Sequence, residues 1–255
     1  MIDPVVVQRN FSISAVHYDE YAEVQSLAAR KLIGRVTTRS FSNIFEIGCG
    51  TGIYTELLAE AFPAAAIDAV DISGPMVSIA RAKLPDERIR FFVCDFDTVT
   101  PDGPFECISS NATFQWLGDT RNAVSVCRRL LVPGGELSFS MFGPNTFSEL
   151  NTCLREVFDG AFSITSGSFL GRESVASILR SAFQNSSVDE EIIRIKYGSV
   201  RELLRAIKYT GTRGMGDVSK RLWTPRTLER LERAYRKEFG GIVATYQAFF
   251  CKAKR

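Results

Sequence analysis

The run from Ile44 to Gly52 constrains the fold of this chain more than any other stretch. An apolar segment ends in the acid Glu46, three glycines follow at alternate positions, and a helical pattern begins at once. Glycine is needed there because a Cβ would keep the backbone from turning sharply and from lying against a ligand. The dinucleotide fingerprint G-x-G-x-x-G does not fit, since the third glycine comes one residue early and Ile53 stands in its place. The run predicts a strand, a ligand-binding turn and a helix, with a plain tight turn of an α/β protein as the alternative.

Polar side chains end the next apolar runs. Asp71 ends the run 64–70, Asp95 follows the run 89–93, and Asn111 follows a fourth run. An acid roughly 20 residues after a glycine loop typically bonds ribose hydroxyls. Ligands of open α/β sheets bind beyond the carboxyl ends of the strands, so we expect these side chains to meet at one site.

Strand and helix patterns alternate from Ile44 to Phe142, which predicts a mostly parallel sheet covered by helices on both faces. Ser73 and Asp119 are expected N-caps, and Trp223 with Thr224 is expected to open the last helix. After the first strand, further strands are expected at 64–70, 89–93, 105–111, 136–142 (entered by a turn at 133–135), 188–195 and 242–251. Beyond the helices that follow the glycine loop and Ser73, helical patterns cover 8–35, 119–131, 146–158, 172–183, 199–208 and 225–239.

Composition excludes several classes of protein. No apolar run approaches the ~20 residues of a membrane span, and no basic N-terminal region precedes an apolar one, so we expect a cytoplasmic protein without membrane contact. The six cysteines form no C-x-x-C pair and are expected to be small buried hydrophobes in a reducing compartment. The single histidine, His17, leaves no His-based metal site and argues against a Ser-His-Asp hydrolase.

The charge is unevenly distributed. Between Arg194 and Lys237 there are 13 Lys or Arg against 4 Asp or Glu, although the whole chain carries only +2. Such asymmetry indicates an acidic partner or a phosphorylated ligand, with a solvated helix face as the alternative. Nucleic acid is not expected, because the pI is modest and the basic region lacks interleaved aromatics.

Sequence blocks over nearly the whole chain resemble one family. The glycine loop and the strand-end acids resemble the first motifs of the Rossmann-like class I methyltransferases that use S-adenosyl-L-methionine. Narrower blocks resemble the malonyl-[acyl-carrier protein] O-methyltransferases of biotin synthesis. These blocks are Phe11-Ser12 with Tyr18-Asp19 and Ala22, Ser110 to Trp116, Leu204 to Gly211, and Thr245 to Gln247.

The resemblance implies a fold and a reaction. It implies a seven-stranded Rossmann-like sheet with a helical lid after the fifth strand, in four parts of one domain: an N-terminal cap (1–40), a cofactor-binding core (41–143), the lid (144–187) and a C-terminal part with basic helices (188–255). Members of the family esterify the free carboxylate of a malonyl thioester, which can then prime the pimeloyl chain. The implied cofactor is S-adenosyl-L-methionine, converted to S-adenosyl-L-homocysteine without a metal, and the implied donor is malonyl-carrier protein or malonyl-coenzyme A.

Candidate site residues follow from the strand ends and the resemblance together. Those for the cofactor are Glu46, Gly48, Cys49, Gly50, Gly52, Asp71, Ile72, Met76, Asp95, Phe96, Asn111 and Gln115. Those for the substrate pocket are Phe11, Trp116, Phe142 and Tyr246, with plain core packing as the alternative for Trp116. Those for the carrier-protein surface are Arg226, Arg230, Arg233, Arg236 and Lys237.

The implied chemistry needs little machinery. A carboxylate, with an ordinary pKa of about 4, is already ionised at neutral pH and needs no general base. A cation must orient it. Lys208 is the first choice, followed by Arg205 and Arg213, and Tyr18 is expected to close over the cofactor or bond the carboxylate. His17 is expected to be a surface or capping histidine, since the reaction needs no base, with a general base as the alternative.

Two rival functions stay open. One is a small-molecule carboxyl methyltransferase of the trans-aconitate type, which would need the cation but no broad basic surface. The other is a non-catalytic protein that binds S-adenosyl-L-methionine and acts on a partner. The sequence leaves open carrier protein against coenzyme A, the oligomeric state and the motion of the lid.

Overall fold

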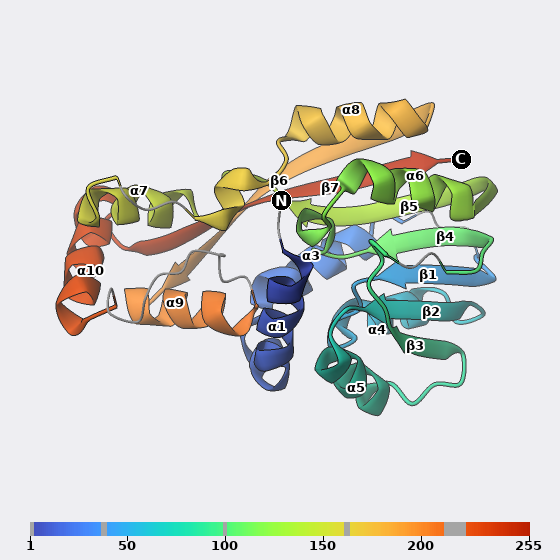
Figure 1. The fold of residues 1–255 in the computed structure, drawn as a ribbon, viewed down its shortest axis with the longest axis horizontal. Helices are drawn as coiled ribbons and strands as arrows, with labels where there is room; N and C mark the ends of the chain where they lie inside the picture. The colour runs from blue at the N-terminus through green and yellow to red at the C-terminus, as the bar shows by residue number, and fades with distance from the viewer. Residues whose placement is uncertain (1–2, 37–39, 99–100, 161–163, 212–222) are drawn as a thin grey trace.

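The computed structural model describes residues 3–36, 40–98, 101–160, 164–211 and 223–255, and these build a seven-stranded sheet. The strand order is β3-β2-β1-β4-β5-β7-β6 (Figure 1). The first five strands pair in parallel, whereas β7 is antiparallel to both neighbours. This confirms the expected sheet. The strands are β1 (Asn43–Ile47), β2 (Ala66–Asp71), β3 (Ile89–Val93), β4 (Phe105–Ser110), β5 (Leu131–Phe142), β6 (Asn185–Tyr197) and β7 (Ile242–Lys254).

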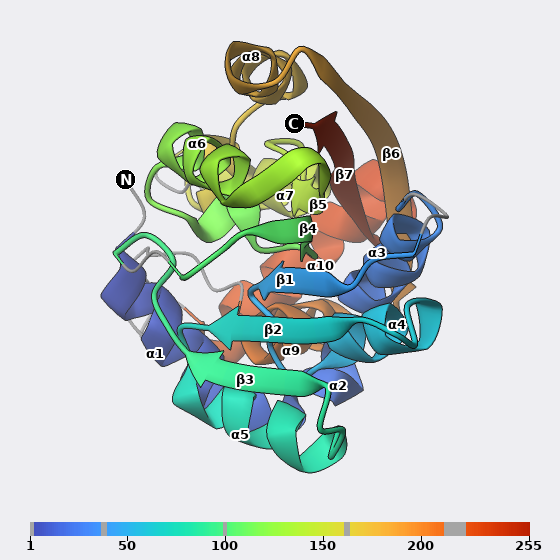
Figure 2. The same ribbon diagram turned by 90° about the vertical axis from the view of Figure 1, so that its right-hand side faces the viewer.

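Helices cover both faces of the sheet. In Figure 2, α3 and α4 lie on one side of the strands and α6 and α8 on the other. Parallel strands are joined by right-handed crossovers, so the helices change faces where the strand order reverses, between β1 and β4. The helices are α1 (Pro4–Ser14), α2 (Tyr18–Tyr21), α3 (Glu23–Ile33), α4 (Ile53–Ala61), α5 (Gly74–Lys83), α6 (Thr120–Leu130), α7 (Ser148–Val157), α8 (Arg172–Ala182), α9 (Val200–Tyr209) and α10 (Pro225–Phe239).

Local sequence signals place the helix starts. The side chains of Ser73, Asp119 and Thr224 each accept a hydrogen bond from the backbone N–H three residues on, at 3.4, 3.0 and 3.2 Å. Each bond satisfies a donor that the first turn of a helix leaves unpaired. These three expected N-caps are confirmed. Trp223, just before the last of them, packs edge-on against Phe158.

One expected turn is part of a strand. The sequence predicts that residues 133–135 turn the chain and that β5 starts at Glu136, but β5 begins at Leu131. Two distant segments supply the partners. Leu131 pairs with Phe105 of β4, and the backbones of residues 134 and 135 bond to Arg255: Gly134 N–H donates to Arg255 O at 2.8 Å, and Arg255 N–H donates to Gly135 O at 3.0 Å. The ladder is therefore extended by a pairing that no local pattern contains.

Two segments break up more than expected. The helical stretch 8–35 divides into α1, a short 3₁₀ turn, α2 and α3. In the segment 144–187, α7 packs against α10 and β7, whereas α8 packs against α6 and β6. Figure 1 shows α7 and α8 at different places along the long strands. The division of the chain into cap, core, lid and C-terminal part stays a prediction.

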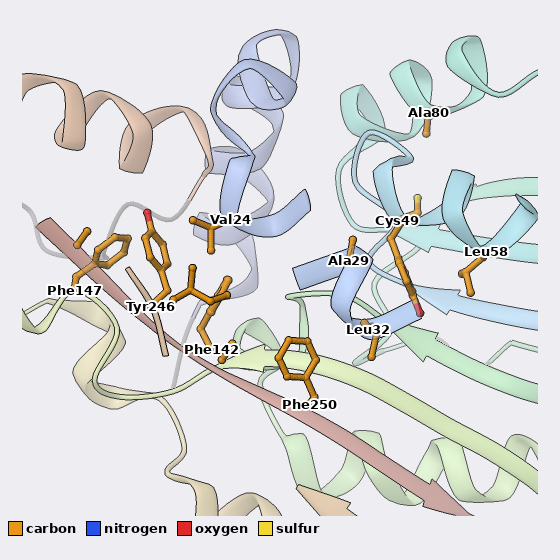
Figure 3. Close-up of a cluster of buried hydrophobic side chains, with 14 of the residues drawn as sticks. Val24, Ala29, Leu32, Cys49, Leu58, Ala80, Phe142, Phe147, Tyr246 and Phe250 are labelled. Atoms are coloured by element: carbon orange, nitrogen blue, oxygen red, sulfur yellow. The ribbon is translucent and has the colours of Figure 1, made fainter. Parts of the chain in front are cut away.

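Two buried apolar clusters lie on opposite faces of the sheet. One joins the α3, α4 and α5 side to residues of α7, α9, α10 and β7, and Figure 3 shows part of it. The other lies under α6 and α8. The C-terminal helices therefore share a continuous core with the sheet, and this positions them beside the carboxyl ends of the strands.

Candidate functional site

A cavity of roughly 920 Å³, its open mouth included, lies at the carboxyl ends of β1 to β4. Helix α1 lies beyond these strand ends (Figure 1). The structure brings together many of the candidate residues as lining: Phe11, Tyr18, Gly48, Cys49, Gly50, Asp71, Ile72, Met76, Asp95, Phe96, Asn111 and Trp116.

The glycine loop forms the cavity wall because its backbone has left-handed dihedrals. Gly48, Gly50 and Gly52 have φ angles of +75°, +53° and +87°. A Cβ on Gly48 would lie 2.1 Å from Oγ1 of Thr113, whereas one on Gly50 would meet no protein atom within 4 Å. Gly50 lines the cavity, so the space beside it is available to a ligand. Gly52 packs instead toward Leu84 and does not line the cavity.

The carboxylate of Asp71 joins two of the loops. It accepts hydrogen bonds from the backbone N–H groups of Gly50 at 2.9 Å and Ser73 at 2.8 Å. Burial raises the pKa of Asp71, although these two donors act in the opposite direction. One side chain at the end of β2 therefore holds the glycine loop against the start of α5.

The loop after β3 also contributes acids to the lining of the cavity. Asp95 accepts from the N–H of Asp97 at 3.0 Å, and Asp97 accepts from the N–H of Gly118 at 2.7 Å. Sequence reasoning missed Asp97, although its place two residues past an acidic strand end could have indicated it. The charged residues of the lining are Asp71, Asp95 and Asp97, and no Lys or Arg of the described ranges lines the cavity.

The loop after β4 contributes residues that line the cavity and residues that hold the loop in place. The Asn111 amide donates to Gln25 O at 3.0 Å and accepts from the Ser140 hydroxyl at 2.7 Å, which fixes it between α3 and β5. Trp116 lines the cavity and lies edge-on to Phe11, with ring centroids 5.9 Å apart. Gln115 does not line the cavity; it is buried and braces the loop by donating to Ala112 O at 2.7 Å.

The N-terminal helices close the cavity and are tied to the loops after β1 and β2. Gln8 donates to Ile72 O at 2.9 Å, and the Ser12 and Ser73 hydroxyls lie 3.0 Å apart. Asp19 accepts from the Thr51 hydroxyl and pairs with Lys83 of α5 at 2.9 Å. The expectation did not include several residues that line this side and the loops: Pro4, Val7, Gln25, Thr51, Tyr54, Cys94, Ala112, Thr113 and Leu117.

Tyr18 carries the phenol that lines the cavity from this cap. Burial raises its pKa far above the ordinary value, and the nearby Asp71 and Asp19 carboxylates raise it further. The hydroxyl therefore stays protonated at every ordinary pH and can donate a hydrogen bond to a ligand.

Glu46 lies under the site rather than in it. Its side chain is fully buried, does not line the cavity, and has no hydrogen-bond partner for either oxygen among the described residues. Burial raises its pKa to about 8, the nearby Thr55 hydroxyl lowers it, and Asp71 raises it again. The sequence shows that an acid ends β1 but not which way it faces.

Four other candidates lie away from the cavity. Phe142 and Tyr246 are buried in the core with ring centroids 5.8 Å apart (Figure 3), and the Tyr246 hydroxyl lies 3.0 Å from that of Tyr197. Lys208 and Arg205 are exposed on α9. Arg213 lies outside the described residues.

The candidate carrier surface on α10 is exposed but partly engaged. Arg230 donates to Val157 O at 3.0 Å, Arg236 pairs with Glu232 at 2.6 Å, and Lys237 lies 3.8 Å from Glu156. Arg226 and Arg233 are exposed as well.

The remaining expectations concern polar and reactive groups. His17 is a surface residue and lies 3.3 Å from Glu20. All six cysteines are free thiols, and five of them are buried. In the part of the chain that the structure describes, no three His, Cys, Asp or Glu side chains gather as a metal site would require, and no helix is both long and apolar enough to cross a membrane.

Comparison with known proteins relates this chain to methyltransferases. Residues 44–135 match a family model described as a methyltransferase domain. Malonyl-[acyl-carrier protein] O-methyltransferase 1 of Ilyobacter polytropus is 36% identical over 94% of this chain and 89% of its own length. The malonyl-[acyl-carrier protein] O-methyltransferase of Bacillus anthracis is 31% identical over 98% of this chain and 97% of its own length.

Solved structures share the fold at lower identity. The YcgJ protein of Bacillus subtilis has a TM-score of 0.63 and 16% identity, covering 90% of this chain and 98% of its own. Phosphoethanolamine N-methyltransferase 2 of Haemonchus contortus, solved with phosphomonomethylethanolamine and S-adenosylhomocysteine, has a TM-score of 0.56 and 20% identity, covering 91% and 52%. These likenesses show the class I methyltransferase fold.

The glycine loop generates a test with a matched control. Gly48 and Gly134 have nearly equal φ angles of +75° and +76°, but only at Gly48 would a Cβ collide with another residue. We expect Gly134→Ala to lower the free energy of unfolding by about 1 kcal/mol through backbone strain. Gly48→Ala should lose about 1–3 kcal/mol more, because Thr113 must move. Urea denaturation of both variants measures this, and equal losses would show that Thr113 yields without cost.

The buried Glu46 carboxyl generates a pH-dependent test. The unfolded chain releases this proton above its ordinary pKa, but the folded chain keeps it until about pH 8. Folding stability is therefore lost as the pH rises between these values. Glu46→Gln cannot titrate, so between pH 5 and pH 8 its free energy of unfolding should rise relative to wild type, by on the order of 2–4 kcal/mol. Urea denaturation of the cofactor-free proteins measures the difference.

The control for this test is Glu56→Gln, an exposed position on α4. It should follow the wild-type pH trend. Parallel curves for Glu46→Gln and wild type would mean that Glu46 is ionised in the folded protein.

Proposed function

The chain belongs to the malonyl-[acyl-carrier protein] O-methyltransferase family, and on that premise we propose that it transfers a methyl group from S-adenosyl-L-methionine to the free carboxylate of a malonyl thioester. One observation carries the proposal. The glycine loop, the three acids beyond β2 and β3, and the phenol of Tyr18 converge on one cavity at the point where the strand order reverses. The esterified product would begin pimeloyl synthesis for biotin.

The charge of the lining supports the cofactor. A dinucleotide pyrophosphate would meet Asp71, Asp95 and Asp97 and no cation from the described residues, which is unfavourable for an anion. S-adenosyl-L-methionine carries a sulfonium and an ammonium against one carboxylate, so the same lining attracts it. The acids also favour the sulfonium over the neutral thioether of S-adenosyl-L-homocysteine.

The residues that would hold the cofactor follow from their positions. We assign the ribose hydroxyls to Asp71, the adenine edge to the loop of Asp95 and Asp97, and the methionine end to the open space beside Gly50. Cys49, Ile72, Met76 and Phe96 complete this wall. When bound, the cofactor supplies an electrophilic methyl group. Gln115 supports the loop after β4 from beneath, and Glu46 and Gly52 lie outside the cavity lining.

The chain's own residues have to orient a nucleophile and exclude water. A malonyl carboxylate is already ionised at neutral pH, so no side chain needs to remove a proton, and no metal is needed. Tyr18 lines the cavity as a protonated phenol and can donate to one carboxylate oxygen, leaving the other free to attack. Phe11 and Trp116 form an apolar wall that would limit water. Positioning of this kind can supply roughly 7 kcal/mol or more of the barrier reduction.

The cation that meets the carboxylate remains a prediction for Lys208, Arg205 or Arg213. The first two are exposed on α9 and would have to reach the cavity when the donor binds. Free cysteines support our proposal that the enzyme works in the cytoplasm, where thiols stay reduced.

Transfer of an isotope-labelled methyl group tests the function. Purified protein is incubated with S-adenosyl-L-methionine labelled in the methyl group and with malonyl-carrier protein. The mass of the carrier protein is then measured by mass spectrometry. We expect one labelled methyl on malonyl-carrier protein and none on acetyl-carrier protein, which has no free carboxylate. Labelling of trans-aconitate with none on the malonyl donor would favour the small-molecule alternative, and no labelling would favour the non-catalytic one.

Replacement of the cavity phenol tests the orienting role. Tyr18→Phe removes only the hydroxyl, and a hydrogen bond to a charged group is worth about 1.5–3 kcal/mol. We expect a loss of roughly 10- to 100-fold in kcat/KM for the malonyl donor, with cofactor affinity within a few-fold of wild type. Tyr21→Phe is the control, because Tyr21 stacks on Tyr209 and does not line the cavity. Normal turnover by Tyr18→Phe would remove this hydroxyl from the reaction.

A further inference from the structure

One face of α9 carries a row of exposed cations. Arg201, Arg205 and Lys208 are all exposed, and their spacing of four and three residues places them on the same side of the helix. The opposite side is buried through Val200, Leu203 and Ala206. At 1.5 Å per residue the row is roughly 10 Å long.

Acids within the described ranges do not neutralise this row. The acid on α9 itself, Glu202, accepts a hydrogen bond from Gly198 N–H at 2.6 Å and so serves the start of the helix. The side chains of Arg201 and Arg205 have no hydrogen bond or ion pair to any described residue, and the Lys208 ammonium lies over the ring of Tyr209 at 4.9 Å. Like charges at this spacing destabilise a helix, so folding alone does not account for the row.

Three of the five cations of α10 differ in this respect, whereas the side chains of Arg226 and Arg233 also have no hydrogen bond or ion pair to a described residue. Arg230, Arg236 and Lys237 each contact an oxygen of a neighbouring element or of α10 itself. A partner at α10 would have to compete with these three contacts, whereas no ion pair or hydrogen bond to a described residue engages the side chains of Arg201 and Arg205 on α9.

The end of the row meets the wall of the cavity. The Ser14 hydroxyl of α1 donates to Lys208 O at 3.1 Å, which joins the last turn of α9 to the N-terminal cap. Just beyond, Gly211 packs so closely on Phe11 that a Cβ there would lie 2.5 Å from its ring. Phe11 lines the cavity. Figure 1 shows α9 and α1 beside each other, next to the carboxyl ends of the strands.

Stacked aromatic rings fix the geometry of this end. Tyr209 stacks on Tyr21 with ring centroids 4.9 Å apart and an interplanar angle of 27°, and His17 lies edge-on to Tyr209 at the same centroid distance. The α9 face and the cap that carries Tyr18 are thereby held in one arrangement. A ligand docked on Arg201, Arg205 and Lys208 would therefore lie next to Phe11, where its reactive end could enter the cavity.

We propose that the α9 face of Arg201, Arg205 and Lys208 is the docking surface for the acidic carrier protein, which presents its malonyl arm to the cavity past Phe11. This inference rests on the proposed function and assigns its partner to α9 rather than α10. The argument is charge complementarity: the face is unpaired and basic, and a carrier protein presents a helix rich in acids. Because these contacts are at the rim, they should act mainly on association and weaken with salt.

The test compares two donors in one assay. Malonyl-carrier protein carries the acidic partner, whereas malonyl-N-acetylcysteamine carries the same reactive end without charge on its tail. Arg201→Glu should lower kcat/KM for malonyl-carrier protein roughly threefold to tenfold at low salt, mainly through KM, and the deficit should shrink as salt is added. Turnover of malonyl-N-acetylcysteamine should stay within about twofold of wild type, because Arg201 lies at the far end of the row from the cavity.

Two matched variants complete the test. Arg128→Glu makes the same charge change at an exposed site on α6, across the sheet, and should leave both donors unaffected. Arg233→Glu makes it on α10 and should have a smaller effect than Arg201→Glu. A larger effect of Arg233→Glu, an unchanged carrier reaction in Arg201→Glu, or equal losses with both donors would each overturn the assignment to α9. A wild-type protein inactive on both donors would instead refute the proposed function.

Discussion

The half-buried carboxylate of Asp71 makes the contacts on which the site depends. By accepting from Gly50 and Ser73, it holds the glycine loop and the start of α5 in one geometry across neighbouring strands. The glycine loop can take that geometry because Gly48 has no Cβ to meet Thr113. A charged acceptor for two backbone donors thus replaces the water that these loops would otherwise need. The other elements that line the cavity surround these two loops.

The N-terminal cap covers the cavity at the carboxyl ends of the strands. Gln8, Ser12 and Asp19 bond to the same loops that Asp71 joins, and this places Phe11 and Tyr18 over the cavity. Many methyltransferases share the sheet, so the selectivity of this protein resides in what covers it. The contact of α1 with the end of α9 extends that cover to the basic surface.

Acidic and basic side chains occupy different parts of the protein. The cavity is lined by acids, which suits a cationic cofactor, while the outer faces of α9 and α10 carry the cations, which suits an acidic donor. A malonyl carboxylate that enters this arrangement has no need of a base, so the enzyme's task is to orient it and to remove water. This explains why a protein whose one histidine is exposed and lies beside Glu20 can serve the reaction.

The sequence alone determined the features that depend on neighbouring residues. The glycine loop, the strand-end Asp71 and Asp95, and the caps at Ser73, Asp119 and Thr224 were predictable, because dihedral preference and capping act over a few residues. The family was predictable as well, because its blocks are contiguous.

Only the tertiary structure decided which way certain side chains face. Glu46, Phe142 and Tyr246 face the core, and Lys208 faces outward, because packing by distant elements and not local pattern selects the buried side of a strand or helix. The start of β5 likewise depends on distant partners: Leu131 pairs with Phe105 of β4, and Gly134 bonds to Arg255, more than a hundred residues away. Local chemistry can be read from a sequence, whereas the direction of each side chain depends on what the rest of the fold places against it.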